Sequence, residues 1–175
     1  MHKTFIIAAG GVVASVSASP AIAGELQVSI EIPRQRVAEY HNPYVAIWIE
    51  DAAGKVVANL DAWYDVDMRG EEAGTKWLPD LRTWWRRAGR SLTMPVNGVS
   101  GPTQPPGRYT LRFPEGARPL GRLAPGAYRL RVEAAREVGG RELVTVPFQW
   151  PARAPQTATA TGTSELGAVR LSVRP

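Results

Sequence analysis

The residues best suited to binding chemistry are tryptophans and arginines that crowd into one short stretch of the sequence. Trp84 and Trp85 are consecutive, so on a helix they point about 100° apart, one toward the core and the other toward its edge. Aromatic rings flanked by guanidinium groups can hold a planar anionic ligand, a sugar or a partner protein. The sequence therefore predicts a partner or ligand surface made of Trp77, Arg82, Trp84, Trp85, Arg86 and Arg87. The same pattern also fits a helix that its tryptophans pin to a sheet, with the arginines in solvent.

Acidic residues precede this stretch, and paired carboxylates offer a different chemistry. They are Asp61, Asp65, Asp67, Glu71 and Glu72. Two carboxylates held a few ångströms apart hydrolyse glycosides, and a divalent cation accepts the same ligands. A carbohydrate-binding or hydrolytic module that uses these acids and the tryptophans is therefore one alternative function. Acids that only solvate a loop are the other explanation, since nothing nearby in the sequence implies a raised pKa.

The sequence lacks the residues that most catalytic centres need. There is no cysteine, which excludes disulfides, thiolate metal sites and thiol nucleophiles. His41 is the only histidine after residue 23, and one histidine is too few for a usual zinc site. No nucleophile elbow, phosphate loop or dinucleotide fingerprint is present. We therefore expect no catalytic residue, no metal site and a function that is not enzymatic.

The first residues have the pattern of an export signal. Lys3 supplies a positive charge, residues 5–16 are almost entirely apolar, and residues 21–23 form a small-x-small cleavage site. Cleavage between Ala23 and Gly24 predicts a signal peptide of residues 1–23 and a secreted, periplasmic chain of residues 24–175. The apolar run is too short to span a bilayer comfortably, so the mature chain is not expected to cross the membrane.

Loss of the signal changes the charge only slightly. The basic count falls from 21 to 20 against 16 acids, which leaves a net charge of +4. Arginine provides 18 of the basic residues, and it suits phosphate, carboxylate and aromatic partners better than lysine does. A mild positive charge also serves solubility. Export argues against a nucleic-acid partner.

Alternation of apolar and polar residues, the period of a half-buried strand, recurs along the chain. Turn residues separate the segments, as between residues 51 and 54. The predicted strands are residues 26–32, 44–50, 56–63, 108–113, 127–135, 141–150 and 166–173. Such a series of strands and turns favours an all-β fold, an antiparallel immunoglobulin-like or fibronectin-like β-sandwich that forms a single domain. The order of the strands is not readable from the pattern.

One region interrupts the strand pattern. Residues 65–77 are polar, and residues 79–87 favour a short helix with Pro79 at its first position and Asp80 at the positive end of its dipole. We therefore predict an inserted loop and helix at about 65–90. Two further loops are predicted, a restrained one rich in proline and glycine at 95–107 and a mobile one rich in alanine and threonine at 151–164.

Four segments resemble the bacterial family of predicted periplasmic proteins called domain of unknown function 2271. They are YVAIWIEDAAGKVV (44–57), KWLPDLRTWWRR (76–87), NGVSGPTQPPGRYTLRF (97–113) and PGAYRLRVEAAREVGG (125–140). Members of that family are usually found with PepSY-type membrane proteins and flavin-transfer systems. The resemblance therefore implies a periplasmic accessory of a membrane redox or metal-uptake system, with an inner-membrane or periplasmic protein as its partner. It supplies no catalytic residue.

The loop at 97–103 is similar to a second pattern, the acceptor motif of proteins that carry covalent FMN. In that motif a threonine hydroxyl takes FMN through its phosphate, and Thr103 occupies the matching position. Asn97 replaces the aspartate that begins the motif, and Pro102 replaces an alanine next to the threonine. The similarity implies an alternative function as an electron-transfer protein with FMN on Thr103. Apart from FMN, no cofactor is expected.

Overall fold

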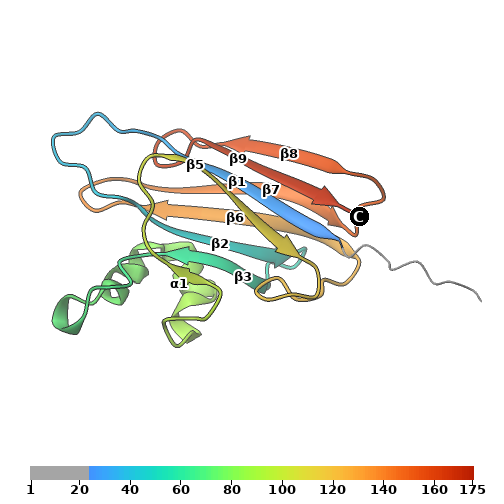
Figure 1. Ribbon diagram of the computed structural model, residues 1–175, viewed down its shortest axis with the longest axis horizontal. Coiled ribbons are helices and arrows are strands. Elements are labelled where there is room, and N and C mark those ends of the chain that lie inside the picture. Colours follow the sequence, from blue (N-terminus) through green and yellow to red (C-terminus); the bar gives the residue numbers. More distant parts are fainter. Residues whose placement is uncertain (1–23) are drawn as a thin grey trace, which may run out of the picture.

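Two sheets packed face to face, with a helical insertion beneath them, form the molecule (Figure 1). The computed structural model describes residues 24–175. Its strands are β1 (Glu25–Ile32), β2 (Tyr44–Asp51), β3 (Val56–Trp63), β4 (Ser100–Gly101), β5 (Gly107–Pro114), β6 (Gly126–Ala135), β7 (Arg141–Trp150), β8 (Gln156–Thr161) and β9 (Ala168–Arg174). The insertion, residues 64–99, holds the short helices η1 (Gly70–Glu72), η2 (Gly74–Asp80), α1 (Arg82–Arg87) and η3 (Gly89–Ser91).

The strand order defines a sandwich. One sheet has the order β5-β1-β9-β8, and the other has the order β4-β3-β2-β6-β7. All neighbours pair antiparallel except the two-residue strand β4, which runs parallel to β3. The predicted all-β sandwich is confirmed, and its immunoglobulin-like or fibronectin-like character stays a prediction.

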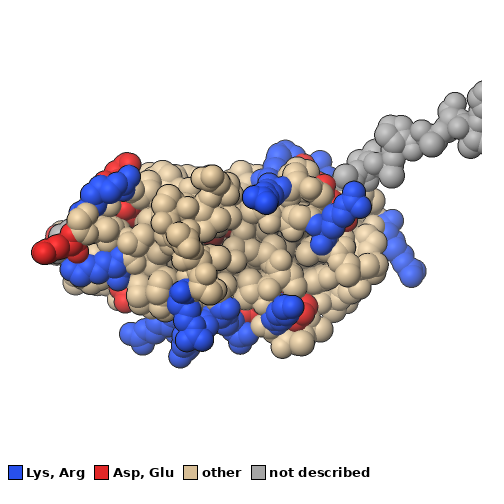
Figure 2. Space-filling view, turned by 90° about the horizontal axis from the view of Figure 1, so that it is seen from below, with Lys and Arg blue, Asp and Glu red and all other residues tan. Residues whose placement is uncertain are grey.

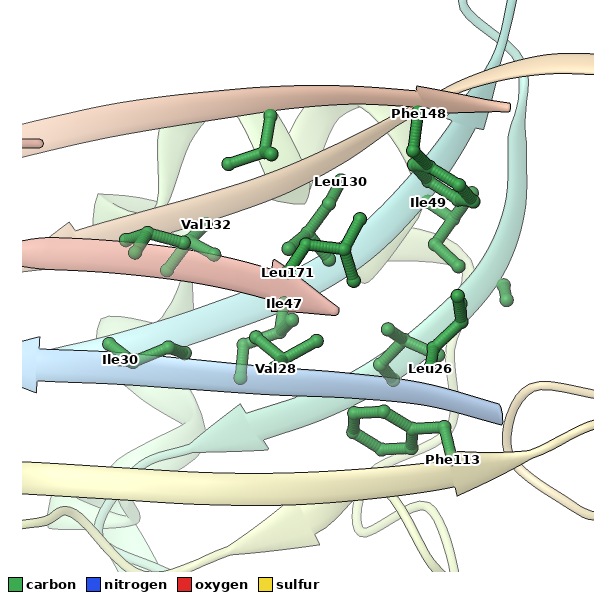
Figure 3. Packing of buried hydrophobic residues seen from close by; sticks show 14 of the residues in the cluster. Leu26, Val28, Ile30, Ile47, Ile49, Phe113, Leu130, Val132, Phe148 and Leu171 are labelled. Atoms are coloured by element: carbon green, nitrogen blue, oxygen red, sulfur yellow. The ribbon is translucent and has the colours of Figure 1, made fainter. Parts of the chain in front are cut away.

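The core between the sheets follows from alternation. On β1 every second side chain, from Leu26 to Ile32, is at most 2% exposed, while the residues between them are half-buried. Val28 lies opposite Leu171 of β9, and the two face Ile47 and Leu130 of the other sheet (Figure 3). Because successive side chains of a strand point to opposite faces, the alternation fixes which face of each strand is buried.

A second core lies on the other side of the five-stranded sheet. Strand β2 is buried on both faces, so Val45, Ile47 and Ile49 enter the core between the sheets while the alternate residues face the insertion. This second core joins β2 to side chains of the insertion: Tyr44, Ala46, Trp48, Tyr64, Leu78, Leu81, Trp84, Ala88 and Val99. The insertion is therefore a third packed layer and no loose loop.

The predicted start of the helix is wrong. Pro79 does not begin an α-helix but lies inside the 3-10 helix η2, and α1 begins only at Arg82. Leu81 separates the two helices with a ψ of 65°, and its side chain and that of Leu78 are both fully buried in the second core. Asp80 consequently lies before α1 and not in its first turn.

The mobile loop predicted at 151–164 is also wrong in its middle part. Residues 156–161 form β8, which pairs with β9 at the edge of the four-stranded sheet. Ala158 and Ala160 turn inward against the core, while the threonines between them are exposed. Small side chains give a weak hydrophobic signal, so the strand depends on backbone pairing that composition does not reveal.

Candidate functional site

A buried carboxylate ties the insertion to the sheet. Glu133 of β6 is 0% exposed and accepts hydrogen bonds from the backbone N–H groups of Thr83, at 3.0 Å, and Trp84, at 2.8 Å. Arg141 of β7 donates to the same carboxylate at 2.5 Å. Leu81, the residue before α1, supplies no side-chain cap. The helix thus takes its N-terminal cap from another layer of the protein, through charge-assisted hydrogen bonds.

The tryptophans hold the second core together from within. Trp84 is 0% exposed, and its indole N–H donates to Asn59 Oδ1 on β3 at 2.8 Å. Trp48 donates in the same way to Glu50 at 2.9 Å, and this buried carboxylate lies 3.4 Å from the guanidinium of Arg87. Buried indoles are satisfied when the N–H finds an acceptor. Trp84 therefore belongs to the core, and its ring does not reach the predicted surface.

Three arginines of the insertion remain in solvent, two from the predicted surface and a third, Arg90, on η3. Arg82, Arg86 and Arg90 are exposed, and no ion pair within residues 24–175 engages any of them. Trp85 lies half-buried between them in sequence and packs against the second core. We call Arg82, Trp85, Arg86 and Arg90 the basic surface. Figure 2 views the molecule from the side of the insertion and shows basic side chains gathered along the lower edge.

Arg87 and Trp77 lie apart from the basic surface. Arg87 is drawn toward the β2–β3 turn, where it donates to the carbonyl of Gly54 at 2.7 Å. Trp77 is on η2, is 44% exposed and forms part of a cavity of about 460 Å³. We call this cavity the Trp77 pocket. The structure thus divides the predicted set among the core (Trp84), the basic surface (Arg82, Trp85 and Arg86), the β2–β3 turn (Arg87) and a pocket (Trp77).

The Trp77 pocket brings together segments that are distant in the sequence. Its wall is built from the approach to β2, from the insertion, from the loop after β4 and from the β6–β7 hairpin. Inside it, Asp65 accepts hydrogen bonds from the hydroxyls of Tyr44, at 3.0 Å, and Thr103, at 3.4 Å. Burial raises the pKa of the Tyr44 phenol, so this hydroxyl stays a donor at all physiological pH values. Asp65 and Thr103, singled out for different reasons, therefore meet at one site.

The other acidic residues do not join them. Asp61 lines a different cavity beside Trp63 and Tyr109, and Asp67 and Glu71 are exposed. Burial raises the pKa of Asp61 to about 6, while hydrogen bonds from Trp63 and from the Ala62 N–H lower it in part. Within the described chain, no group of three or more histidine, aspartate or glutamate side chains is placed to hold a metal ion.

Sequence reasoning missed Glu133, the residue that holds the start of α1 and with it the basic surface. A signal was present, because Glu133 is the one charged residue in the last four of β6, next to three small or apolar ones. It also missed Tyr40, Met68 and Val138 on the pocket wall. These three residues have no motif, since only the folded chain brings them to Trp77.

The described residues define a β-sandwich protein with a covering insertion. The chain belongs to DUF2271, a family of predicted periplasmic proteins, whose model matches residues 25–168. This match confirms the resemblance seen in the sequence and the location in the periplasm. Comparison with curated proteins and with solved structures gave no match. In residues 24–175, no helix has the length and apolarity to cross a bilayer. The predicted signal peptide, residues 1–23 with cleavage after Ala23, lies outside the described residues.

Replacing Glu133 by glutamine tests the anchor. The amide is a weaker acceptor and leaves Arg141 without its carboxylate, so Glu133→Gln should lower the free energy of unfolding by about 2–3 kcal/mol. Chemical denaturation at neutral pH measures this change. Glu39→Gln is the control, because the Glu39 side chain is 76% exposed and its loss should change stability by less than about 0.5 kcal/mol. Equal stability of the two variants would contradict the anchoring role.

Asp61 predicts a pH dependence of stability. Its folded pKa of about 6 lies above the unfolded value of about 3.9, so the folded chain binds more protons between these values. The free energy of unfolding should therefore fall as the pH rises through this window. Asp61→Asn should remove that fall and stabilise the protein at pH 7 by about 1–3 kcal/mol. Urea titrations at about pH 4.5 and about pH 7 measure the free energy of unfolding of both proteins. If it changes with pH as much in the variant as in the original protein, Asp61 is not the cause.

Proposed function

We propose that this protein is a non-enzymatic periplasmic accessory that docks onto an acidic surface of a partner protein through its basic surface. The observation that carries the proposal is the charge of Arg82, Arg86 and Arg90, which no carboxylate of the described residues compensates. Arginine presents a planar set of donors that matches carboxylates in pairs of hydrogen bonds. An acidic partner would supply the missing carboxylates.

The aromatic residue in this surface supports a protein as the partner. Trp85 lies between the arginines in sequence and is only half-buried. Tryptophan and arginine dominate the few residues that carry most of the binding energy in protein interfaces. The anchor at Glu133 adds to this, because residues held rigidly before binding lose less conformational entropy when the complex forms.

The sequence resemblance supports the identity of the partner. Members of the family are usually found with PepSY-type membrane proteins, so we take an inner-membrane protein of a flavin-linked redox or metal-uptake system as the docking target. The family match to a predicted periplasmic protein agrees with the side of the membrane that such docking requires. The basic surface would then face the periplasmic portion of the membrane protein.

Two triple variants test the docking surface. Arg82→Ala, Arg86→Ala and Arg90→Ala together should weaken the complex at least about tenfold, because each lost arginine removes a charge-assisted contact. The control is Arg153→Ala, Arg170→Ala and Arg174→Ala, which removes the same charge from exposed positions after β7 and on β9. Periplasmic cross-linking of the tagged protein in its own host, with the PepSY-type protein as the identified product, measures complex formation.

The outcomes separate specific docking from general attraction. The proposal expects the cross-linked complex to persist in the control and to be lost in the first variant. Equal loss in both variants would show attraction by net charge alone, and an undiminished complex in both would remove the basic surface from the interface. Far-ultraviolet spectra and thermal melts of both variants establish that each one is folded.

Covalent attachment of FMN at Thr103 is a second candidate function, and one observation favours it. The Thr103 hydroxyl lies on the wall of the Trp77 pocket, where the rings of Trp77 and Tyr44 offer aromatic faces to a flavin. The carboxylate of Asp65 lies 3.4 Å from that hydroxyl and would repel the negatively charged phosphate of FMN. FMN bound there would supply electron transfer, while the described residues would only hold and orient it.

Mass spectrometry of the mature protein tests this candidate. Protein from the periplasm of a strain that has a flavin transferase should carry the added mass of one FMN less water, and it should be yellow. Thr103→Ala should lose both properties, whereas Thr110→Ala, at an exposed position on β5, should keep them. Colourless protein of unmodified mass from the same strain would remove FMN from the function.

A further inference from the structure

Exposed large apolar side chains are concentrated at the rim of the Trp77 pocket. Five large apolar side chains are exposed in residues 24–175, and three of them, Met68, Trp77 and Val138, line this one pocket. Val138 is the extreme case, with 85% of its surface exposed. Single exposed apolar residues are ordinary, but a group of them around a cavity indicates a binding site.

The backbone holds Val138 on the rim at a conformational cost. Val138 has a φ of +50° and is the only non-glycine residue of the described chain with a positive φ. A β-branched side chain is strongly disfavoured there, although Gly139 and Gly140 follow directly and would accept such a conformation without strain. The position therefore presents an apolar side chain to solvent where folding alone favours a glycine.

The hairpin that carries Val138 is fixed in place. Glu165, which is 4% exposed, accepts hydrogen bonds from Arg136 Nε at 2.9 Å and from the Gly140 N–H at 2.8 Å. These contacts clamp both ends of the turn, so Val138 is presented by a rigid element. A rim of this kind needs little reorganisation when a ligand binds.

The polar groups of the pocket offer both acceptors and donors. Asp65, Asp80 and Glu137 contribute carboxylates, while Tyr44 and Thr103 contribute hydroxyls. Two further wall residues, Tyr40 and Arg136, each have a buried polar atom, Oη and Nη1, without a protein hydrogen-bond partner. A ligand that matches this wall must itself carry donors and acceptors side by side.

Charge narrows the class of ligand. An anion would share the pocket with three carboxylates of its wall, which is unfavourable in a partly enclosed site. A cation would meet the ammonium of Lys76, which already lies 5.0 Å from the centre of the Trp77 ring. The guanidinium of Arg136 is also on the wall, where Glu165 pairs with it. A neutral molecule with many hydroxyls avoids both conflicts, since each hydroxyl both donates and accepts.

We propose that the Trp77 pocket binds an uncharged saccharide. Trp77, Met68 and Val138 would cover the apolar C–H face of a sugar ring, while Asp65 and Asp80 accept hydrogen bonds from its hydroxyls. The volume of about 460 Å³ lies within the range of small-ligand sites. The inference does not depend on the basic surface, whose side chains are different. It shares the pocket and Trp77 with the FMN candidate, so the two proposals place different occupants at one site.

Titration with sugars of defined structure tests this site. Residues 24–175 are applied to a glycan array, and cellobiose, lactose, chitobiose and the glycans retained on the array are then titrated while tryptophan fluorescence and backbone amide shifts are recorded. Spermidine and glucose 6-phosphate serve as the cationic and anionic probes. At least one neutral glycan should bind, and the amide shifts should be largest at residues 136–140 and around Thr103.

Matched variants decide where the sugar binds. Trp77→Ala should weaken binding at least about tenfold, and Asp80→Asn, at an exposed side chain, should weaken it by about threefold or more. Val57→Ala, at an exposed apolar side chain outside the pocket, should change the affinity by less than about twofold. The proposal is overturned if no neutral glycan binds, if spermidine or glucose 6-phosphate binds more tightly, or if Trp77→Ala and Asp80→Asn both retain full affinity.

Discussion

The carboxylate of Glu133 is the contact on which the three-layer arrangement depends. It projects from the outer face of β6, beside Ala46 of β2, which leaves room above the sheet because alanine is small. An ionised carboxylate buried at 0% exposure is costly unless its oxygens are fully engaged. Two backbone N–H groups of α1 and the guanidinium of Arg141 engage them. The Glu133 carboxylate of the sheet and the first N–H groups of α1 are therefore each other's hydrogen-bond partners. If the two layers separate, both lose these partners.

This constraint explains how a short helix can hold a basic surface in solvent. A helix of six residues is not stable by itself, and its hydrophobic contact runs mainly through Trp84. The anchor and the buried indole leave the opposite side of the segment, with Arg82 and Arg86, directed to solvent on a rigid support. Glu165, from the loop before β9, likewise holds the β6–β7 hairpin and so fixes the rim of the Trp77 pocket. In both places a buried carboxylate positions residues whose own side chains make no structural contact of comparable strength.

Much of the fold was predictable because it depends on local alternation. The bounds of β3 and β7 agree with the predicted segments, and the inward face of β1 follows from Leu26, Val28 and Ile30. The start of α1 was not predictable, since its cap comes from a residue 50 positions away in the sequence. The pocket has the same origin: Asp65 and Thr103, separated by 38 positions, meet only through the path of the insertion and the loop after β4. Sequence patterns report the layers, whereas contacts between layers decide the sites.

Amide hydrogen exchange at Thr83 and Trp84 tests the central claim most directly. If Glu133 fixes the insertion as an integral layer, these two amides open only with the sheet, and their protection should match that of the β2 and β6 amides to within about tenfold. Exchange should then respond to denaturant with the slope of global unfolding. Protection of Thr83 and Trp84 near that of an unfolded chain, while β2 and β6 stay protected, would contradict the account, because the insertion would then detach from a sheet that remains folded.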